Sequence, residues 1–393
     1  MKICQVISDS NIGGAGVLVE RICKALCDEF EFLVVVPKGA KLKGLFESEE
    51  ISGCRAGVHS RRRAERSEQR REEVQRGSIQ VVEMPMAKDR SFRAGDVERF
   101  RELFAHEKPD IVHTHATLSA RVGARLAGVK AILSTRHCAK EKCEKTSFLY
   151  RKIYNSVTDL TISTALYAKK NLIDEGVFPG RIQVIYNGSP VTPRTTQKER
   201  LALKESLGIP KGALVLGSVA RLEVVKGQDI MIEALARLIC EGKYDFHLVL
   251  VGTGSAEGMY RSLARELGVE RRVHFVGFSD TPYHYQNIFD INLNASRGTE
   301  TSCLATSECM SLGVVTVASD FGGNPEMIRD GVTGLLFPKD DVASLTERIR
   351  TLADEPTLYL ALSSGARWMY ENTYSLERMA NAYRALYRSI GEK

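Results

Sequence analysis

Two glutamates eight positions apart, Glu300 and Glu308, lie in a segment that otherwise contains small, polar and apolar residues, SRGTETSCLATSECMSLG. The run 291–295 just before it is typical of a buried strand, which places Glu300 in the loop after that strand. The pattern of 304–313 predicts a helix, and Glu308 lies within it. A carboxylate in such surroundings is costly unless it accepts strong hydrogen bonds. The two hydroxyls of a ribose could donate such bonds, so the pair is a candidate nucleotide contact.

The helix that contains Glu308 begins directly after the loop that starts at Thr301. The first N–H groups of a helix have no carbonyl partner inside the helix, and they form part of the positive end of its dipole. Anions bind at such ends. We therefore expect the backbone near Ser302, Cys303 and Leu304 to suit a diphosphate.

Two cations, Arg221 and Lys226, follow the expected strand 213–220 in the sequence GSVARLEVVKGQD. In parallel α/β sheets, ligands bind beyond the carboxyl ends of the strands. The two cations could therefore neutralise a diphosphate and stabilise it as it departs. A surface ion pair with Glu223 or Asp229 is the alternative that the sequence leaves open.

Gly13 and Gly14 lie between the first expected strand and the first expected helix, in SDSNIGGAGVLVERI. Glycines at such a turn allow a ligand to approach the backbone and the helix N-terminus. The spacing is G-G-x-G and not the dinucleotide fingerprint G-x-G-x-x-G. The glycines therefore indicate either a ligand loop or a tight turn.

Short apolar runs alternate with amphipathic, helix-like stretches along nearly the whole chain of 393 residues. Continuous apolar strands separated by helices indicate parallel sheets that are covered on both faces. Seven strands are expected in the first half, at residues 2–8, 30–36, 79–84, 110–115, 130–135, 159–163 and 182–187. Six more are expected in the second half, at residues 213–220, 246–252, 272–278, 291–295, 314–319 and 333–337. The fold class is therefore predicted to be α/β, with two doubly wound, Rossmann-like domains joined near 187–193, where turn residues gather.

The net charge of +6 is unevenly distributed, because residues 1–190 contain 32 Lys and Arg against 24 Asp and Glu. Part of this excess lies in the arginine-rich segment 55–76. That segment is interpreted as a solvated loop, with contact to a membrane or to acceptor phosphate as the alternative. No apolar run approaches the length of a membrane span, and the N-terminus does not have the pattern of a signal peptide. The protein is expected to be cytoplasmic. Its basic first half is the candidate surface for contact with the inner face of the membrane.

Taken together, these residues resemble the retaining glycosyltransferases of family 4, which have the GT-B fold. Glu300 and Glu308 reproduce the E-x7-E motif of that family. Other pieces follow in the order of the family: the glycine loop, the ARL…KG element, VGTGS, VHFVGF and SDFGGNPEMIRDGVTGLLF. The resemblance implies an acceptor-side domain at 1–190, a nucleotide-sugar-binding domain at 191–374 and a final helix at 375–393 that packs back on the first domain.

The resemblance also implies roles for particular residues. Glu308 corresponds to the glutamate that binds ribose, Glu300 to the one beside the donor sugar, and His137 to a histidine at the sugar end of the cleft. The implied catalytic residues are His137, Arg221, Lys226 and Glu300. The implied substrate-binding residues are Gly13, Gly14, Gly252, Thr301, Ser302, Cys303, Leu304 and Glu308. No metal and no cofactor is implied, because the cations and the helix N-terminus would hold the diphosphate of the donor.

Some positions depart from the family pattern. Thr301 begins a Thr-Ser-Cys sequence where the family commonly has a Gly-Phe type of sequence, and Val315 replaces a usual proline. These positions lie near the donor sugar, so the sequence does not identify that sugar. His113 and His115, at the end of an expected strand, are candidates for contact with the acceptor or the sugar, with local hydrogen bonding as the alternative.

The predicted function is transfer of a sugar, with retention of anomeric configuration, from a nucleotide-sugar to a hydroxyl of a glycan, a lipid-linked acceptor or a small molecule. A sugar-nucleotide epimerase of the same fold is one alternative. A non-catalytic binding subunit is another. Nucleic acid is not expected as a partner, because no aromatic residues alternate with the arginines of 55–76 to stack on bases.

Overall fold

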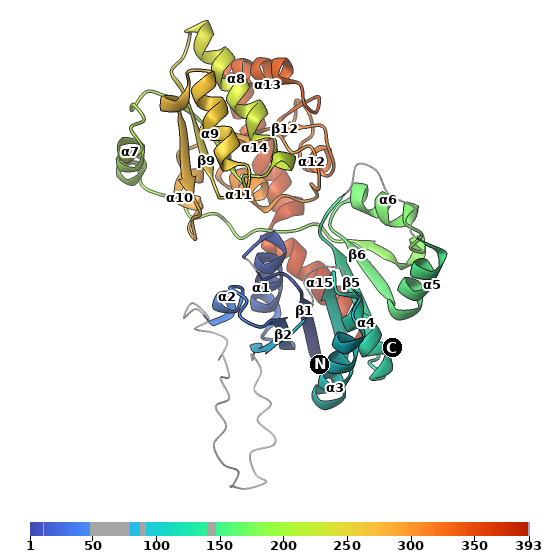
Figure 1. Ribbon diagram of the computed structural model, residues 1–393. Coiled ribbons are helices and arrows are strands. Elements are labelled where there is room, and N and C mark those ends of the chain that lie inside the picture. Colours follow the sequence, from blue (N-terminus) through green and yellow to red (C-terminus); the bar gives the residue numbers. More distant parts are fainter. Residues whose placement is uncertain (11, 48–78, 87–91, 140–146, 392–393) are drawn as a thin grey trace.

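The computed structural model describes residues 1–10, 12–47, 79–86, 92–139 and 147–391. These residues form two lobes, one above the other, each built on a parallel sheet with helices on its faces (Figure 1). The arginine-rich segment 55–76 lies outside the described residues. The α/β class with two doubly wound sheets is confirmed.

The first sheet has seven strands in the order β3-β2-β1-β4-β5-β6-β7, all paired in parallel. Its strands are β1 (Lys2–Ile7), β2 (Glu31–Pro37), β3 (Ile79–Met84), β4 (Ile111–His115), β5 (Ala131–Arg136), β6 (Leu160–Ser163) and β7 (Ile182–Val184). Its helices are α1 (Gly14–Leu26), α2 (Lys43–Glu47), α3 (Ala94–Glu107), α4 (Leu118–Leu126), α5 (Phe148–Val157) and α6 (Leu166–Asp174). The central strands are buried on both faces, which explains why their sequences are continuous apolar runs and do not alternate.

The second sheet has six strands in the order β10-β9-β8-β11-β12-β13, again all parallel. Its strands are β8 (Leu214–Val219), β9 (Phe246–Val251), β10 (Val273–Gly277), β11 (Ile291–Asn294), β12 (Val315–Ser319) and β13 (Leu335–Phe337). Its helices are α7 (Gln197–Ser206), α8 (Gln228–Glu241), α9 (Glu257–Glu266), α10 (Tyr283–Gln286), α11 (Leu304–Leu312), α12 (Asn324–Met327), α13 (Val342–Asp354) and α14 (Pro356–Met369). All thirteen strands expected from the sequence are present.

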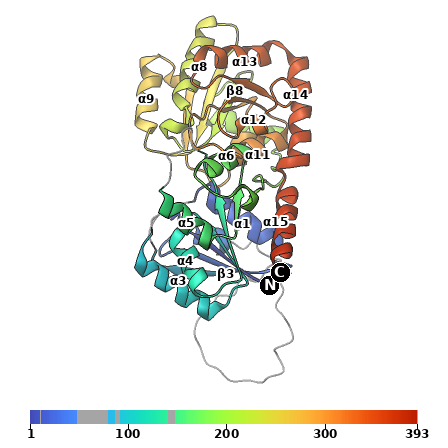
Figure 2. The same cartoon turned by 90° about the vertical axis from the view of Figure 1, so that its right-hand side faces the viewer.

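The last helix, α15 (Leu376–Gly391), leaves the second lobe and packs against α1 of the first, as predicted. In Figure 2, α14 and α15 form one red edge that runs from the upper lobe down to the lower one. The side chains of Tyr383 and Tyr387 are buried in the core of the first lobe. The Gln5 amide on β1 donates to the Tyr387 hydroxyl at 2.9 Å. The C-terminal helix is thus part of the first core, although it follows the second in sequence.

The two sheets share one topology, and this topology positions the site. In each sheet the chain reverses direction across the sheet between the first and fourth strands, β1 and β4 in one and β8 and β11 in the other. Ligands of open α/β sheets bind at this reversal point, beyond the carboxyl ends of the strands. The stretches directly after β1, β8 and β11 contain most of the residues singled out in the sequence, and His113 and His115 belong to β4 itself. In the described part of the chain, no helix is long and apolar enough to cross a membrane.

Candidate active site

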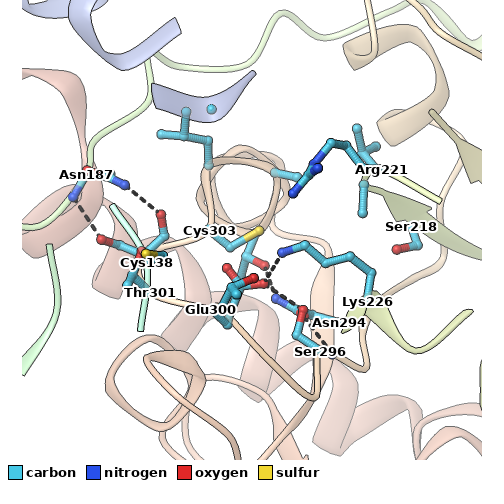
Figure 3. A pocket seen from close by; sticks show the side chains of 18 of the residues that line it. Cys138, Asn187, Ser218, Arg221, Lys226, Asn294, Ser296, Glu300, Thr301 and Cys303 are labelled. Carbon is cyan, nitrogen blue, oxygen red and sulfur yellow. Dashed lines mark hydrogen bonds and ion pairs between the residues drawn. The ribbon is translucent and has the colours of Figure 1, made fainter. Parts of the chain in front are cut away.

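A cavity of about 410 Å³ lies between the two lobes (Figure 3). All four predicted catalytic residues line it: His137, Arg221, Lys226 and Glu300. So do five of the predicted substrate-binding residues: Gly14, Thr301, Ser302, Cys303 and Leu304. The structure therefore brings together nine residues that come from four separate stretches of sequence.

Lys226 and Glu300 form an ion pair in the wall of this cavity. The Lys226 ammonium lies 2.7 Å from Oε2 of Glu300, and the Ser296 hydroxyl donates to the same oxygen at 2.6 Å. Burial by itself lowers the pKa of Lys226, but the neighbouring charge of Glu300 raises this pKa above its ordinary value. The ammonium therefore stays charged at neutral pH and is available to a diphosphate. Ser296 was not predicted from the sequence, although it stands in the opening segment.

The loop that holds Glu300 depends on close backbone packing. Thr299, just before it, adopts a left-handed conformation with φ of 64°. Gly322 and Gly323 lie against the loop so closely that an added Cβ would come within 2.5 Å of the Glu300 carbonyl oxygen or 2.2 Å of that of Thr301. The glycine pair of SDFGGNPEM thus supports the Glu300 loop from behind, and only glycine leaves room for it.

The N-terminus of α11 opens into the cavity. Cys303 is its N-cap residue and makes no capping hydrogen bond through its side chain. Asn187, from the segment that joins the lobes, fixes the preceding turn: its backbone N–H donates to the Ser302 hydroxyl and its side-chain amide to the Ser302 carbonyl, each at 3.0 Å. On the other side, the Thr301 hydroxyl donates to the backbone carbonyl of His137 at 3.2 Å. Both lobes therefore position the helix end.

Arg221 follows β8 and extends toward the same space as Lys226 (Figure 3). Gly252 does not line the cavity. Instead it lies directly behind the Arg221 loop, where an added Cβ would come within 2.1 Å of the Ala220 carbonyl oxygen. Its φ of 137° and its hydrogen bond to Gly277 fit a support for that loop. Gly13 also lies outside the cavity lining, as the N-cap residue of α1.

Glu308 does not line the cavity either. Its carboxylate receives a hydrogen bond from Arg21 of α1 at 2.7 Å and one from the Gln286 amide at 3.1 Å. The ion pair joins the two lobes, and the side chains of both Arg21 and Glu308 are 15% exposed. No local sequence pattern predicts this pairing, because Arg21 is 287 positions away from Glu308.

A chain of hydrogen bonds leads from the cavity into the first core. His137 Nε2 lies 2.7 Å from His115 Nδ1, and His115 Nε2 lies 2.9 Å from Oε1 of Gln5. Tyr387 accepts from Gln5 and contacts His113 Nδ1 at 2.9 Å. With the Gln5 amide in this orientation, His115 donates through Nε2, and its Nδ1 accepts from His137. Burial, with the charges of neighbouring histidines, lowers the pKa of His115 well below its ordinary value.

These contacts place His113 and His115 differently. His113 is fully buried and hydrogen-bonded to Tyr387 and Thr135. Of the two alternatives for His113, local hydrogen bonding is therefore the one that the structure shows. Burial, followed by the charge of His137, lowers its pKa to about 3. His115 contacts His137 directly and therefore lies one hydrogen bond from the cavity. Further cavity residues that the sequence did not reveal are Cys138, Asn187, Ser218, Asn292, Asn294 and Ser296.

The geometry agrees with comparisons to known proteins. The sequence profile described as Glycosyltransferase Family 4 matches residues 12–191, and that described as Glycosyl transferases group 1 matches residues 199–369. EpsD of Bacillus subtilis (strain 168), which is named as a glycosyltransferase, is 31% identical over 296 residues, covering 70% of this chain and 76% of EpsD. The chain belongs to the family 4 glycosyltransferases.

Two further similarities place this glycosyltransferase among its relatives. The D-inositol 3-phosphate glycosyltransferase of Corynebacterium aurimucosum is 28% identical over 289 residues, covering 65% of this chain and 66% of that protein. The crystal structure of Anabaena Alr3699/HepE in complex with UDP superposes with a TM-score of 0.78 at 20% identity, covering 99% of this chain and 100% of the other. The overall fold is therefore GT-B. As a member of the family, this glycosyltransferase transfers a sugar from a nucleotide-sugar.

Among the described residues, no group of three or more His, Cys, Asp or Glu side chains is placed to hold a metal ion. The positive groups in the cavity of this glycosyltransferase are instead Arg221, Lys226 and the N-terminus of α11. Together they surround a space with the charge and the size to receive a diphosphate.

Proposed function

We propose that this glycosyltransferase moves a sugar, with retention of anomeric configuration, to a hydroxyl of a glycan, a lipid-linked acceptor or a small molecule. The observation that carries the proposal is the buried Lys226–Glu300 ion pair beside the N-terminus of α11. It lies beside the first backbone N–H groups of a helix, so that a cation, a carboxylate and a helix N-terminus surround one cavity. A diphosphate and the sugar attached to it need these three kinds of partner.

The donor is proposed to lie with its diphosphate between Arg221, Lys226 and the N-terminus of α11. Its sugar would extend toward Glu300 and His137, and its ribose toward Glu308. For this last contact, Glu308 would have to share its carboxylate with Arg21 or release it. UDP-sugars are the first donors to test, since structures of HepE are described with UDP and with UDP-glucose.

The acceptor is proposed to bind in a second cavity, of about 630 Å³, on the side of the first lobe. The two cavities share Ala15, His137, Cys138 and Arg221 in their walls. We propose that an acceptor hydroxyl at this shared wall meets the anomeric carbon on the face from which the diphosphate leaves. Attack and departure on the same face would retain the configuration.

In the proposed reaction, the bond between the anomeric carbon and the β-phosphate oxygen breaks as the acceptor oxygen bonds to the same carbon. The proton of the acceptor hydroxyl passes to the departing phosphate oxygen. Lys226 and Arg221 stabilise the negative charge that grows on the diphosphate. Because this stabilisation is stronger in the transition state than in the bound substrate, it lowers the activation barrier of the transfer. His137 positions the sugar, its own ring being held by His115.

A donor screen followed by product analysis tests this function. Thermal stabilisation by a set of nucleoside diphosphates identifies the base, because a ligand at about 100 times its Kd adds roughly 2.7 kcal/mol to the unfolding free energy. The matching nucleotide-sugar is then incubated with the enzyme alone, and the sugar released to water is followed by NMR at early times. We expect slow hydrolysis in which the first-released sugar has the anomeric configuration of the donor.

Other outcomes distinguish the alternatives. Conversion of the donor to an epimer without any acceptor identifies an epimerase. Tight binding of nucleotide-sugar without hydrolysis or transfer, for every donor tested, indicates a non-catalytic binding subunit. Release of the opposite anomer contradicts the retaining mechanism but not the donor site.

A further inference from the structure

Arg121 lies in the wall of the acceptor-side cavity, on the second turn of α4. Only 2% of the residue is exposed. Its guanidinium lies over the ring of Tyr154, 4.4 Å from the ring centre, and its Nη1 donates to the Thr158 hydroxyl at 2.9 Å. Its Nε is buried and has no hydrogen-bond partner. Arg121 is therefore a buried cation whose described partners are all neutral.

Other buried or half-buried cations near these two cavities are paired with carboxylates. Arg136, in the same cavity wall as Arg121, pairs with Glu175, and Lys226 pairs with Glu300. Within the described ranges, no carboxylate lies within ion-pair distance of Arg121. Removing a charge from water is costly unless an opposite charge and good hydrogen bonds replace the water. An aromatic ring and one hydroxyl do not supply that opposite charge.

The charges around the cavity leave an excess of positive charge. Three arginines line it, Arg121, Arg136 and Arg221, against two carboxylates, those of Asp9 and Glu175. Glu175 is engaged by Arg136. His115 and His137 also face this space, and His115 is held neutral because burial lowers its pKa. An anion in the cavity would therefore be attracted to it.

The start of α4 adds to this positive character. Ala116, the residue before the N-cap, lines the cavity and adopts a left-handed conformation with φ of 94°. The N-cap residue, Thr117, makes no capping hydrogen bond, and its hydroxyl is buried without a partner. The positive end of the α4 dipole thus begins at the cavity wall, one turn from Arg121.

We propose that Arg121 binds an oxyanion, a phosphate or a carboxylate, that is part of the acceptor. A guanidinium presents donors in a planar fork that matches both groups. Bound there, the anion would complete the pairing of Arg121 and orient the acceptor hydroxyl toward the shared wall at His137. The inference rests on the proposed function, because it assigns the acceptor to this cavity.

The test uses inorganic phosphate and malonate as probes, titrated by calorimetry into the full chain saturated with UDP. UDP occupies the donor site, so that the probe does not bind at Arg221 and Lys226. Three proteins are compared: the parent, Arg121→Gln and Arg125→Gln. Arg125 is the matched control, since it lies one turn further along α4 and pairs with Asp159 at 2.6 Å, with 38% of its side chain exposed.

We expect the parent and Arg125→Gln to bind at least one probe with equal affinity. In Arg121→Gln that affinity should fall roughly 10- to 100-fold, as expected for loss of hydrogen bonds to a charged group. Tighter binding of phosphate then indicates a phosphate group on the acceptor, and tighter binding of malonate indicates a carboxylate. Equal binding by Arg121→Gln and the parent, or no binding of either probe by the parent, would overturn the proposal.

A second measurement does not depend on the folding of a variant. Crystals of the parent with UDP are soaked in selenate, an oxyanion that anomalous scattering locates. An anomalous peak within hydrogen-bond distance of the Arg121 guanidinium supports the proposal, and its absence there contradicts it. UDP affinity, measured in the same calorimetry, tests the donor site separately. If the parent does not bind UDP, the proposed donor is wrong. The probes are then titrated without UDP, and the comparison of Arg121→Gln with the parent still tests the role of Arg121.

Discussion

The Lys226 ammonium and the Glu300 carboxylate are 2.7 Å apart in the wall of the cavity between the lobes. Glu300 is only 5% exposed, so its negative charge depends on this partner and on the Ser296 hydroxyl. An ammonium has three donors, and one bond to Glu300 leaves two for a diphosphate. One lysine can therefore hold the carboxylate in place and bind the donor at the same time.

Lys226→Met should destabilise the fold as well as weaken donor binding. Removal of one partner of a buried ion pair leaves the other charge uncompensated, which costs about 3–5 kcal/mol of unfolding free energy. Lys243→Met is the control, since Lys243 pairs with Asp354 at the surface, with 56% of the lysine side chain exposed, and such pairs contribute little to stability. Urea unfolding measures both. A Lys226→Met protein as stable as Lys243→Met would show that Glu300 does not need its lysine.

His137→Ala should lower turnover more than nucleotide affinity, because the proposed contact of His137 is with the sugar of the donor. Calorimetry with UDP and hydrolysis of saturating UDP-sugar measure the two effects. His106→Ala is the control, since that side chain is 84% exposed at the end of α3. Much weaker UDP binding with normal turnover of the saturated His137→Ala enzyme would show that the placement is wrong.

His113 should make the fold sensitive to acid. Burial and the charge of His137 lower its pKa to about 3, whereas an unfolded histidine has a pKa of about 6.5. Below pH 6.5 the unfolded chain therefore binds a proton that the native chain does not, and stability falls as the pH falls until the native pKa is reached. The slope from this one group is about 1.4 kcal/mol per pH unit.

The variant His113→Asn lacks this group and should lose less stability than the parent between pH 6.5 and pH 4.5, by about 2–3 kcal/mol. Denaturant unfolding at a series of pH values gives the slopes. Parallel pH profiles for His113→Asn and the parent would mean that His113 is protonated in the native protein at these pH values.

The sequence was sufficient for the strands and for the charged residues of the cavity, because both depend on local patterns. Apolar runs marked each buried strand, and Glu300, Arg221 and Lys226 each followed one. What the sequence could not supply were partners from distant segments. The Asn187–Ser302 hydrogen bonds and the Arg21–Glu308 ion pair join residues 115 and 287 positions apart. No local period encodes such contacts.

The glycines predicted to bind substrate also differ in their positions relative to the cavity. Gly14 lines the cavity, but Gly13 and Gly252 lie beside or behind it. A glycine at a strand end fits both a ligand contact and close packing of two backbone segments, and only the neighbours decide which applies. For Gly252 the neighbour is the Ala220 carbonyl, next to Arg221.

Glu308 is the residue for which the geometry and the proposed role differ most. In this structure its carboxylate faces Arg21 and Gln286, whereas the proposal assigns it to the ribose of the donor. Arg21→Gln separates the two roles. If Glu308 served only to join the lobes, Arg21→Gln and Glu308→Gln would have the same effect on UDP binding.

In the proposed donor site, Glu300 contacts the sugar and Glu308 contacts the ribose. The most direct test of this site is calorimetric titration of UDP into Glu308→Gln, Glu300→Gln and Arg21→Gln, after thermal melting has shown that each variant is folded. Loss of a hydrogen bond to a charged group costs about 1.5–3 kcal/mol, so Glu308→Gln should bind UDP roughly 10- to 150-fold more weakly, while its affinity for inorganic diphosphate is unchanged. Glu300→Gln should bind UDP like the parent but with impaired transfer, and Arg21→Gln should bind UDP at least as tightly as the parent with normal transfer. A folded Glu308→Gln protein that binds UDP like the parent would contradict the account.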